Sequence, residues 1–278
     1  MIRILVDSSA DYTAEEILTL GLDFVPITIS LGENDYLDGI NLTKDQLYEA
    51  LENDSSLFPK TSQPSPAEFL NIFEDVKKKG DEIICIMLSS KLSGTYQSAV
   101  LAKNIVDYDK IYIIDSRTAT CGTRLLVDHV RKLRLENIPA IKIAESLEEL
   151  KSRIRVYAGV DTLEYLCRGG RLSHTAATIG ELANLKPILT IQNGTVEVLG
   201  KCLGRIKAAN YVLDILKGKE IDTDYPFYTI YSYGTDNLEK LESKLEKEGY
   251  PVASSHQLGA AIGSHVGPGC FGVVFIEK

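Results

Sequence analysis

Short apolar runs alternate with amphipathic segments through the first half of the chain. The runs at 2–6, 24–31, 82–88 and 111–114 are typical of strands, and the first has the continuous apolar character of a strand buried on both faces. Helical patterns fill the intervals and continue to about residue 155. This order of elements predicts a mainly parallel sheet with helices on both faces.

Several of the expected helices have a recognisable start. The strongest is Ser65-Pro66-Ala67-Glu68, where Ser65 can cap, Pro66 suits the first helical position and Glu68 can reach back to the cap. That helix is expected to end at Gly80, and another is expected to begin near Gly94. The same capping-box spacing occurs twice more, at Thr13 with Glu16 and at Thr43 with Gln46.

The second half of the chain has a different pattern. Asn193-Gly194 joins the runs 187–192 and 195–199, which is a strong signal for a two-residue β-hairpin. Further strands are expected at 225–233 and 271–276. We therefore expect an α/β protein of two closely packed subdomains, 1–157 with the parallel sheet and 158–278 with a mixed sheet and helices.

Composition narrows the possible functions. Hydrophobic residues make up 44% of the 278 residues, and the formal net charge is −9, which disfavours nucleic acid as the main partner. The five cysteines are scattered, and no His or Cys spacing suits a metal. The N-terminus does not resemble a signal peptide, and no apolar run is long enough to span a membrane. A cytoplasmic protein without a metal is expected.

Three polar clusters lie next to expected strands or helix starts. They are the segments 7–11 (DSSAD), 61–64 (TSQP) and 89–95 (SSKLSGT). Ligands of open parallel sheets lie beyond the carboxyl ends of the strands. Hydroxyls and free N–H groups at a helix start can bind an anion. The alternative is that these residues only cap helices.

A glycine-rich segment near the C-terminus needs a separate interpretation. Gly267 to Gly272 matches the dinucleotide fingerprint GxGxxG, but a strand and not a helix is expected to follow it, so we reject that function. His265 lies just upstream and could donate a hydrogen bond to a bound carboxylate. The alternative is a purely structural histidine. No serine lies in a GxSxG elbow.

Taken in order, these motifs resemble the DegV family of bacterial lipid-binding proteins. The resemblance spans nearly the whole chain and rests on DSSAD at 7–11, TSQPSP at 61–66, LSGTYQSA at 92–99, LEYL at 163–166 followed by RGGR at 168–171, KPIL at 186–189 and HVGPG at 265–269. It implies two α/β subdomains with one long-chain fatty acid between them and no other cofactor. It also implies a non-catalytic subunit that presents the acyl carboxylate to a separate ATP-dependent fatty acid kinase subunit for phospholipid synthesis.

The resemblance also implies roles for individual residues. The residues matched to the site that binds the fatty-acid carboxylate are Thr61, Ser62, Ser93, Gly94 and His265. The residues matched to a basic surface that contacts the kinase are Arg168, Arg171, Lys201 and Arg205. Many relatives have a basic residue where this chain has Leu203, which lies between Lys201 and Arg205.

Two other functions compete with the lipid carrier. One is a stand-alone hydrolase or transferase of acyl or phosphoryl groups, with Ser93 as nucleophile and His265 as its base. The other is a regulatory interaction protein with a vestigial pocket. The energetics of burial are consistent with a lipid carrier. Burying a 16-carbon tail contributes about 10 kcal/mol of favourable free energy before the costs of association are subtracted.

Overall fold

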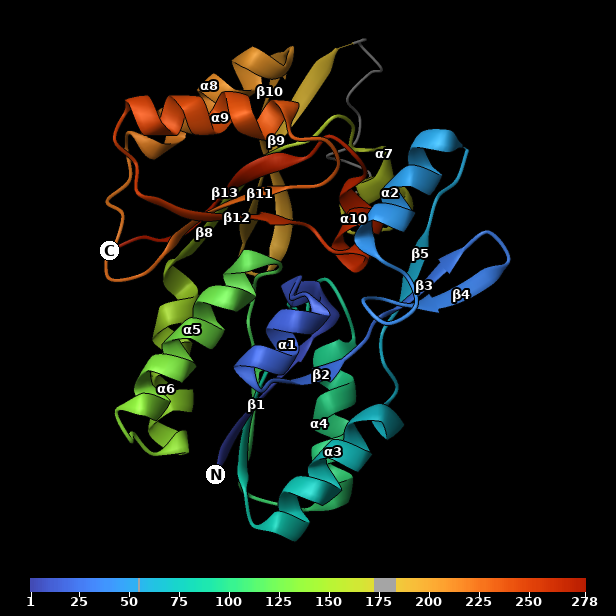
Figure 1. The fold of residues 1–278 in the computed structure, drawn as a ribbon, viewed down its shortest axis with the longest axis vertical. Coiled ribbons are helices and arrows are strands. Elements are labelled where there is room, and N and C mark those ends of the chain that lie inside the picture. Colours follow the sequence, from blue (N-terminus) through green and yellow to red (C-terminus); the bar gives the residue numbers. More distant parts are fainter. Residues whose placement is uncertain (55, 173–183) are drawn as a thin grey trace.

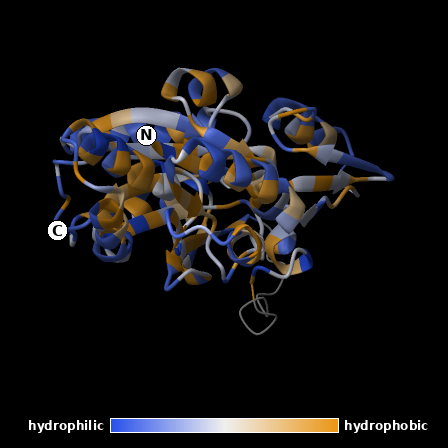
Figure 2. Cartoon of the chain, turned by 90° about the horizontal axis from the view of Figure 1, so that it is seen from below, coloured by the Kyte–Doolittle hydropathy of each residue, from blue (hydrophilic) through white to orange (hydrophobic). Residues whose placement is uncertain are grey.

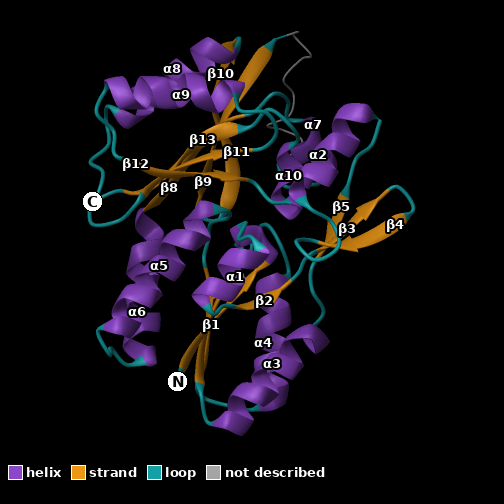
Figure 3. Cartoon of the chain, in the orientation of Figure 1, coloured by secondary structure: helices purple, strands orange, loops and turns teal. Residues whose placement is uncertain are grey.

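The computed structural model describes residues 1–54, 56–172 and 184–278. The first half contains a four-stranded parallel sheet of order β2-β1-β6-β7, as predicted. Figures 1 and 3 show β1 and β2 of this sheet below the second half of the chain. Its strands are β1 (Ile2–Asp7), β2 (Asp23–Val25), β6 (Glu82–Met87) and β7 (Ile111–Asp115).

Helices cover both faces of this first sheet. Along β1 and β6, Leu5 and Cys85 pack against α3 and α4, whereas Ile4 and Ile84 pack against α5 and α6. This alternation follows from the two-residue period of a strand. The helices of this half are α1 (Ala14–Leu20), α3 (Pro66–Lys79), α4 (Thr95–Val106), α5 (Cys121–Leu135) and α6 (Ala140–Leu150), with short 3-10 turns η1 (Ser8–Ala10) and η2 (Lys151–Arg153).

The second half contains a six-stranded mixed sheet of order β10-β9-β8-β13-β11-β12, in which only β11 and β12 pair in parallel. Its strands are β8 (Ile154–Gly159), β9 (Leu185–Gln192), β10 (Thr195–Leu203), β11 (Phe227–Tyr231), β12 (Val252–Gln257) and β13 (Phe271–Ile276). Helices α8 (Arg205–Leu216) and α9 (Asp236–Lys247) pack on one face. The other face joins the core that includes α5.

A third sheet lies to one side of the two larger ones (Figure 1). It has the order β4-β3-β5, from β3 (Thr28–Leu31), β4 (Asn34–Leu37) and β5 (Lys60–Ser62). Helix α2 (Lys44–Asn53) and helix α10 (Ala260–Val266) pack together beside it, and α10 also contacts α7 (Glu164–Arg168). A segment of the C-terminal half is thereby brought against the N-terminal half.

Several sequence predictions differ from this arrangement. The strand expected at 24–31 is divided at Pro26 into β2 and β3, which belong to different sheets, because proline has no N–H for a continuous ladder. The helical pattern expected to about residue 155 ends at Leu150. The expected boundary at residue 157 falls within β8.

Other local predictions are confirmed. The Ser65 N–H donates to the Glu68 carboxylate at the start of α3. Asn193 and Gly194 both have positive φ, as a two-residue hairpin turn requires. Hydrophilic and hydrophobic residues share the same helices (Figure 2), which is the pattern of helices with one buried side. Within the described ranges, we find no helix with the length and apolar character to cross a membrane.

Candidate functional site

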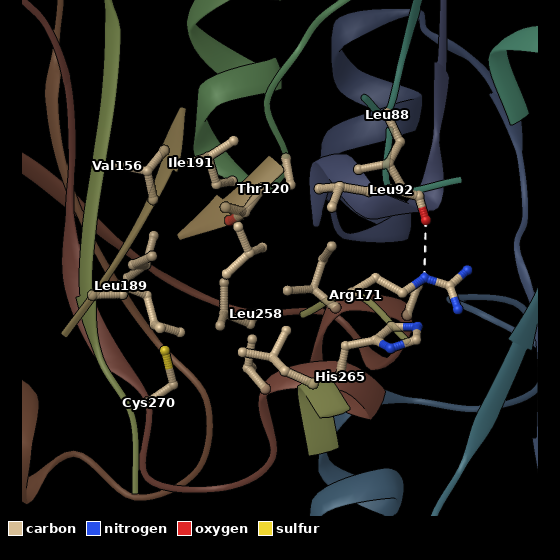
Figure 4. Close-up of a pocket in the computed structure, with 18 of the residues that line it drawn as sticks. Leu88, Leu92, Thr120, Val156, Arg171, Leu189, Ile191, Leu258, His265 and Cys270 are labelled. Carbon is tan, nitrogen blue, oxygen red and sulfur yellow. Dashed lines mark hydrogen bonds between the residues drawn. The ribbon is translucent and has the colours of Figure 1, made fainter. Parts of the chain in front are cut away.

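A narrow cavity, here called the slot, lies between the loops at the carboxyl edge of the first sheet and the second sheet (Figure 4). Its volume is about 100 Å³. Aliphatic side chains form most of its wall, and the residues that line it are Ile27, Thr61, Leu88, Leu92, Ser93, Ala119, Thr120, Val156, Ala158, Val160, Leu166, Arg171, Leu189, Thr190, Ile191, Val196, Ile230, Leu258, Ala261, Ile262, His265, Val266 and Cys270.

The slot has polar groups that come from distant parts of the sequence. Thr61 Oγ1 of β5 lies 2.7 Å from His265 Nε2 of α10. Ser93 lines the same slot just before α4, and its Oγ lies 2.9 Å from Thr95 Oγ1. The structure therefore brings Thr61, Ser93 and His265 to one cavity.

Gly94 and Ser62 were also expected at the carboxylate site, but neither lines the slot. A Cβ on Gly94 would lie 2.1 Å from Gln63 Oε1, so the Gln63 side-chain amide packs directly over Gly94 at the start of α4. Ser62 is exposed and lies outside the slot lining.

His265 lies in a tightly packed environment. A Cβ on Gly169 would approach His265 Nδ1 to 2.2 Å, so the α7 loop contacts the imidazole directly. Burial, and next the nearby Arg171 charge, lower the pKa of His265 to about 4. The imidazole is therefore neutral at physiological pH. Among the described residues, its Nδ1 has no hydrogen-bond partner.

Arg171 lies in the wall of the slot and not on an outer surface. Its Nε donates to the Leu92 carbonyl at 2.9 Å, and its Nη1 donates to the Gly169 carbonyl at 2.5 Å. Figure 4 shows its side chain beside His265. No carboxylate within the described ranges forms an ion pair with it, and burial lowers the pKa of its guanidinium. The docking role expected for Arg171 stays a prediction.

The other residues of the expected docking surface are further from the slot. Arg168 pairs with Glu164 at 2.7 Å and covers the Phe58 ring at 3.7 Å. Arg205 pairs with Asp161 at 2.7 Å. Lys201 is exposed on β10, and Leu203 beside it is 58% exposed. The basic groups at this surface are thus partly neutralised by local carboxylates.

The 7–11 cluster has a structural role. The Asp11 carboxylate accepts the Gly259 N–H at 2.8 Å, and Asp38 accepts the N–H groups of Ala260 and Ala261. Both carboxylates hold the start of α10, which carries His265. Burial raises the pKa of Asp11 to about 7 and that of Asp38 to about 6. Sequence reasoning missed Asp38, because no motif surrounds it.

The geometry bears on two enzymatic interpretations, the hydrolase or transferase and the dinucleotide-binding protein. The first requires His265 to act as the base of Ser93. In the structure the His265 ring contacts Thr61, and the hydroxyl next to Ser93 is that of Thr95. Gly267–Gly272 follows α10 and leads into strand β13, which confirms the rejection of the dinucleotide fingerprint. Within the described ranges, no group of three or more His, Cys, Asp and Glu side chains is arranged to hold a metal.

Comparison with known proteins identifies the family. A family model described as "Uncharacterised protein, DegV family" matches residues 1–278. The chain belongs to the DegV family. A DegV domain-containing protein of Caldanaerobacter subterraneus is 38% identical over 100% of this chain and 99% of its own length.

Solved structures of DegV proteins agree with the fold. A Thermus thermophilus structure described as showing fatty acid binding of a DegV family protein has a TM-score of 0.89 and 31% identity, with 100% of this chain and 99% of that chain covered. A Eubacterium ventriosum protein described as binding stearic acid has a TM-score of 0.91 and 27% identity, with the same coverage. These descriptions apply to the neighbours.

Proposed function

We propose that this chain binds one long-chain fatty acid in the slot and presents its carboxylate to a separate ATP-dependent fatty acid kinase subunit in the cytoplasm. The observation that carries the proposal is a mainly aliphatic slot that also contains Thr61, Ser93 and His265. Such a slot is complementary to a molecule with a long apolar tail and one polar end. The neighbours from Thermus and Eubacterium, described as fatty-acid-binding proteins, support the same ligand class.

The tail supplies the affinity in this proposal. Each buried methylene contributes roughly 0.8 kcal/mol. Most of the slot wall is aliphatic, so a tail that lies along it is removed from water.

The polar groups would hold the carboxylate. A buried carboxylate needs hydrogen-bond donors and a compensating charge. We infer that His265 carries its proton on Nε2 and donates it to Thr61, because a proton on Nδ1 would leave a buried donor unpaired. The Thr61 hydroxyl is then free to donate to the ligand together with Ser93, and Arg171 supplies the positive charge.

A separate protein would supply ATP. The sequence contains no GxxxxGK[ST] phosphate-binding loop, and Thr61, not Ser93, is the hydrogen-bond partner of His265. Both observations favour a carrier over a stand-alone enzyme. The kinase would approach the side of the molecule that carries Arg168 and Lys201, and its product would be acyl phosphate for phospholipid synthesis.

Lipid extraction from the purified protein followed by mass spectrometry tests the carrier function. We expect one fatty acid per chain, or uptake of added fatty acid by protein that was purified empty. Protein that stays empty after incubation with C14 to C18 acids would overturn the proposal. A coupled assay with a fatty acid kinase and ATP then tests presentation, and fatty-acid binding without any acyl phosphate would refute the kinase step alone.

A further inference from the structure

A second cavity of about 380 Å³ lies at the junction of the two halves. Its wall comes from the loop after β7, from the connection between α6 and β8, and from the β9–β10 hairpin. This volume is within the range of small-molecule sites, which are common at such junctions. The lining is polar in character, with hydroxyl, amide and basic groups.

The charge of this cavity is opposite to that of the whole protein. Four basic side chains line it, namely Arg117, Lys151, Arg155 and Lys219. Among the residues that the structure describes, two carboxylates pair with them: Glu148 with Lys151, and Glu277 with both Arg155 and Lys219. Four positive charges less two negative charges leave +2 in a chain whose net charge is −9.

Two of the basic groups differ from ordinary surface charges. The Lys151 side chain is only 6% exposed, so its ammonium lies in the wall and not in bulk water. Arg117 is exposed, and within the described part of the chain no carboxylate forms an ion pair with its guanidinium. Lys151 is paired with Glu148, so the Arg117 guanidinium is the group in this lining that favours an anionic ligand.

We propose that this second cavity binds a small anion that carries a phosphate group, such as a phosphorylated metabolite. Arg117 supplies a planar fork for two phosphate oxygens, and Arg155 and Lys219, which share the single carboxylate of Glu277, supply the remaining positive charge. Ser152, Gln192 and Asn193 add neutral groups that can hydrogen-bond an ester or sugar portion. Bidentate phosphate recognition is the characteristic role of arginine at such sites.

The proposed anion would tie the two halves together. Arg117 belongs to the loop after β7, whereas Lys219 follows α8 in the second half. The tip of the β9–β10 hairpin already contacts the first half here, since Ser89 Oγ donates to the Gly194 carbonyl at 2.7 Å. Thr190 and Ile191 line both this cavity and the slot. A bound anion should therefore slow the release of a fatty acid, a consequence that rests on the proposed function.

Isothermal titration of the full chain with pyrophosphate at low ionic strength tests the site. We expect saturable binding of one pyrophosphate, weakened about tenfold by Arg117→Gln. Arg117→Lys should recover only part of the affinity, because an ammonium keeps the charge and loses the fork. Lys240→Gln is the matched control, since it removes one exposed positive charge from α9, away from the cavity.

The outcomes separate the site from general charge effects. No saturable binding at millimolar pyrophosphate would overturn the proposal, and so would equal weakening by Arg117→Gln and Lys240→Gln. Release of a fluorescent fatty acid is then measured with and without pyrophosphate. Unchanged release despite binding would reject the coupling to the slot and leave the anion site intact. Failure of fatty-acid binding altogether would reject the proposed function alone.

Discussion

Thr61 Oγ1 and His265 Nε2 lie 2.7 Å apart although 204 positions separate these residues in the sequence. Thr61 is on β5 of the small third sheet, and His265 is near the end of α10. Two buried carboxylates, Asp11 and Asp38, hold the start of α10 in place. The polar part of the slot is therefore assembled from elements of both halves, and its geometry depends on how α10 is anchored.

The first prediction concerns the hydroxyl groups of the slot. Ser93→Ala and Thr61→Val should each weaken fatty-acid binding, because each change removes one donor to a buried carboxylate. A loss of about 1 to 3 kcal/mol corresponds to roughly 5- to 150-fold in the dissociation constant. Titration with a fluorescent fatty acid measures it.

Ser62→Ala is the matched control for these variants. Ser62 follows Thr61 directly, but it is exposed and lies outside the slot lining. Its replacement should leave both affinity and thermal stability unchanged. If Ser62→Ala weakened binding as much as Thr61→Val, the effect would belong to the loop as a whole and not to the Thr61 hydroxyl.

The second prediction concerns Gly169, which acts through His265. Gly169 has φ −74° and ψ −10°, a conformation that alanine adopts freely, so the new Cβ is the only perturbation. That Cβ would lie 2.2 Å from His265 Nδ1 and must displace the ring. Gly169→Ala should weaken fatty-acid binding about as much as His265→Ala does, and it should shift the His265 resonances in NMR spectra.

Gly218→Ala provides the comparison, because the nearest atom to its Cβ would be 3.7 Å away. It should bind fatty acid normally. Normal binding by Gly169→Ala as well would show that the position of the imidazole is not required, and His265 would then be a packing residue.

How far the sequence predicts this molecule depends on the kind of feature. The capped helices and the 193–194 hairpin depend on contacts within a few residues, and these predictions were confirmed. The split at Pro26 and the third sheet depend on long-range pairing, which a local pattern does not contain. In the same way, the hydroxyl clusters pointed to an anion, but only the fold shows that Asp11 anchors a helix.

Arg171 illustrates the same limit at the site. RGGR at 168–171 is a continuous motif, and its two arginines have the same sequence neighbourhood. The structure separates them, because Arg171 bonds to carbonyls in the slot wall while Arg168 turns outward to Glu164 and Phe58. A difference of this type comes from packing around α7 and cannot be derived from residue type or spacing.

The third prediction concerns pH. The pKa of His265 is lowered from its ordinary 6.5 to about 4, so between these values the unfolded chain binds a proton that the folded chain does not. The stabilisation from the neutral ring is present above pH 6.5 and is lost as pH falls toward 4, by about 3 kcal/mol in total. Urea unfolding of the protein and of His265→Gln at several pH values measures it.

The difference in the free energy of unfolding between the two proteins is the informative quantity. Other titrating groups such as His256 and Asp38 contribute equally to both proteins and cancel. The difference should shrink as pH falls through the window from 6.5 to 4. A difference that stays constant with pH would contradict the lowered pKa of His265.

The fourth prediction concerns the length of the acyl chain. In Figure 4, Val156 and Leu189 lie at the opposite side of the slot from His265. Val156→Phe should fill space needed by the tail, so affinity should fall more for C18 than for C12 acids. Each excluded methylene costs roughly 0.8 kcal/mol. An equal loss for all chain lengths would indicate general damage to the fold, which a thermal melt would also reveal.

The last prediction separates the two arginines of the 168–171 loop. Arg171→Ala should weaken fatty-acid binding about tenfold or more, because the carboxylate loses the positive charge in the slot wall. Arg171→Lys should restore part of the affinity if charge is what matters. Normal fatty-acid binding by Arg171→Ala would contradict a role in the slot and favour the kinase contact that the resemblance implies for Arg171.

Arg168→Ala combined with Lys201→Ala should have the opposite phenotype. Arg168 is 57% exposed at the side chain and pairs with Glu164, so neither change touches the slot. Fatty-acid affinity should stay near normal, while kinase-dependent formation of acyl phosphate should slow, because exposed charges at an interface rim mainly set the association rate. The difference in the rate of acyl phosphate formation between this variant and the unchanged protein should decrease as salt is added, since salt screens the attraction that the variant lacks.

A rate difference that is independent of salt would assign these residues a role other than electrostatic attraction. Loss of fatty-acid binding together with phosphorylation would place them in the binding site instead.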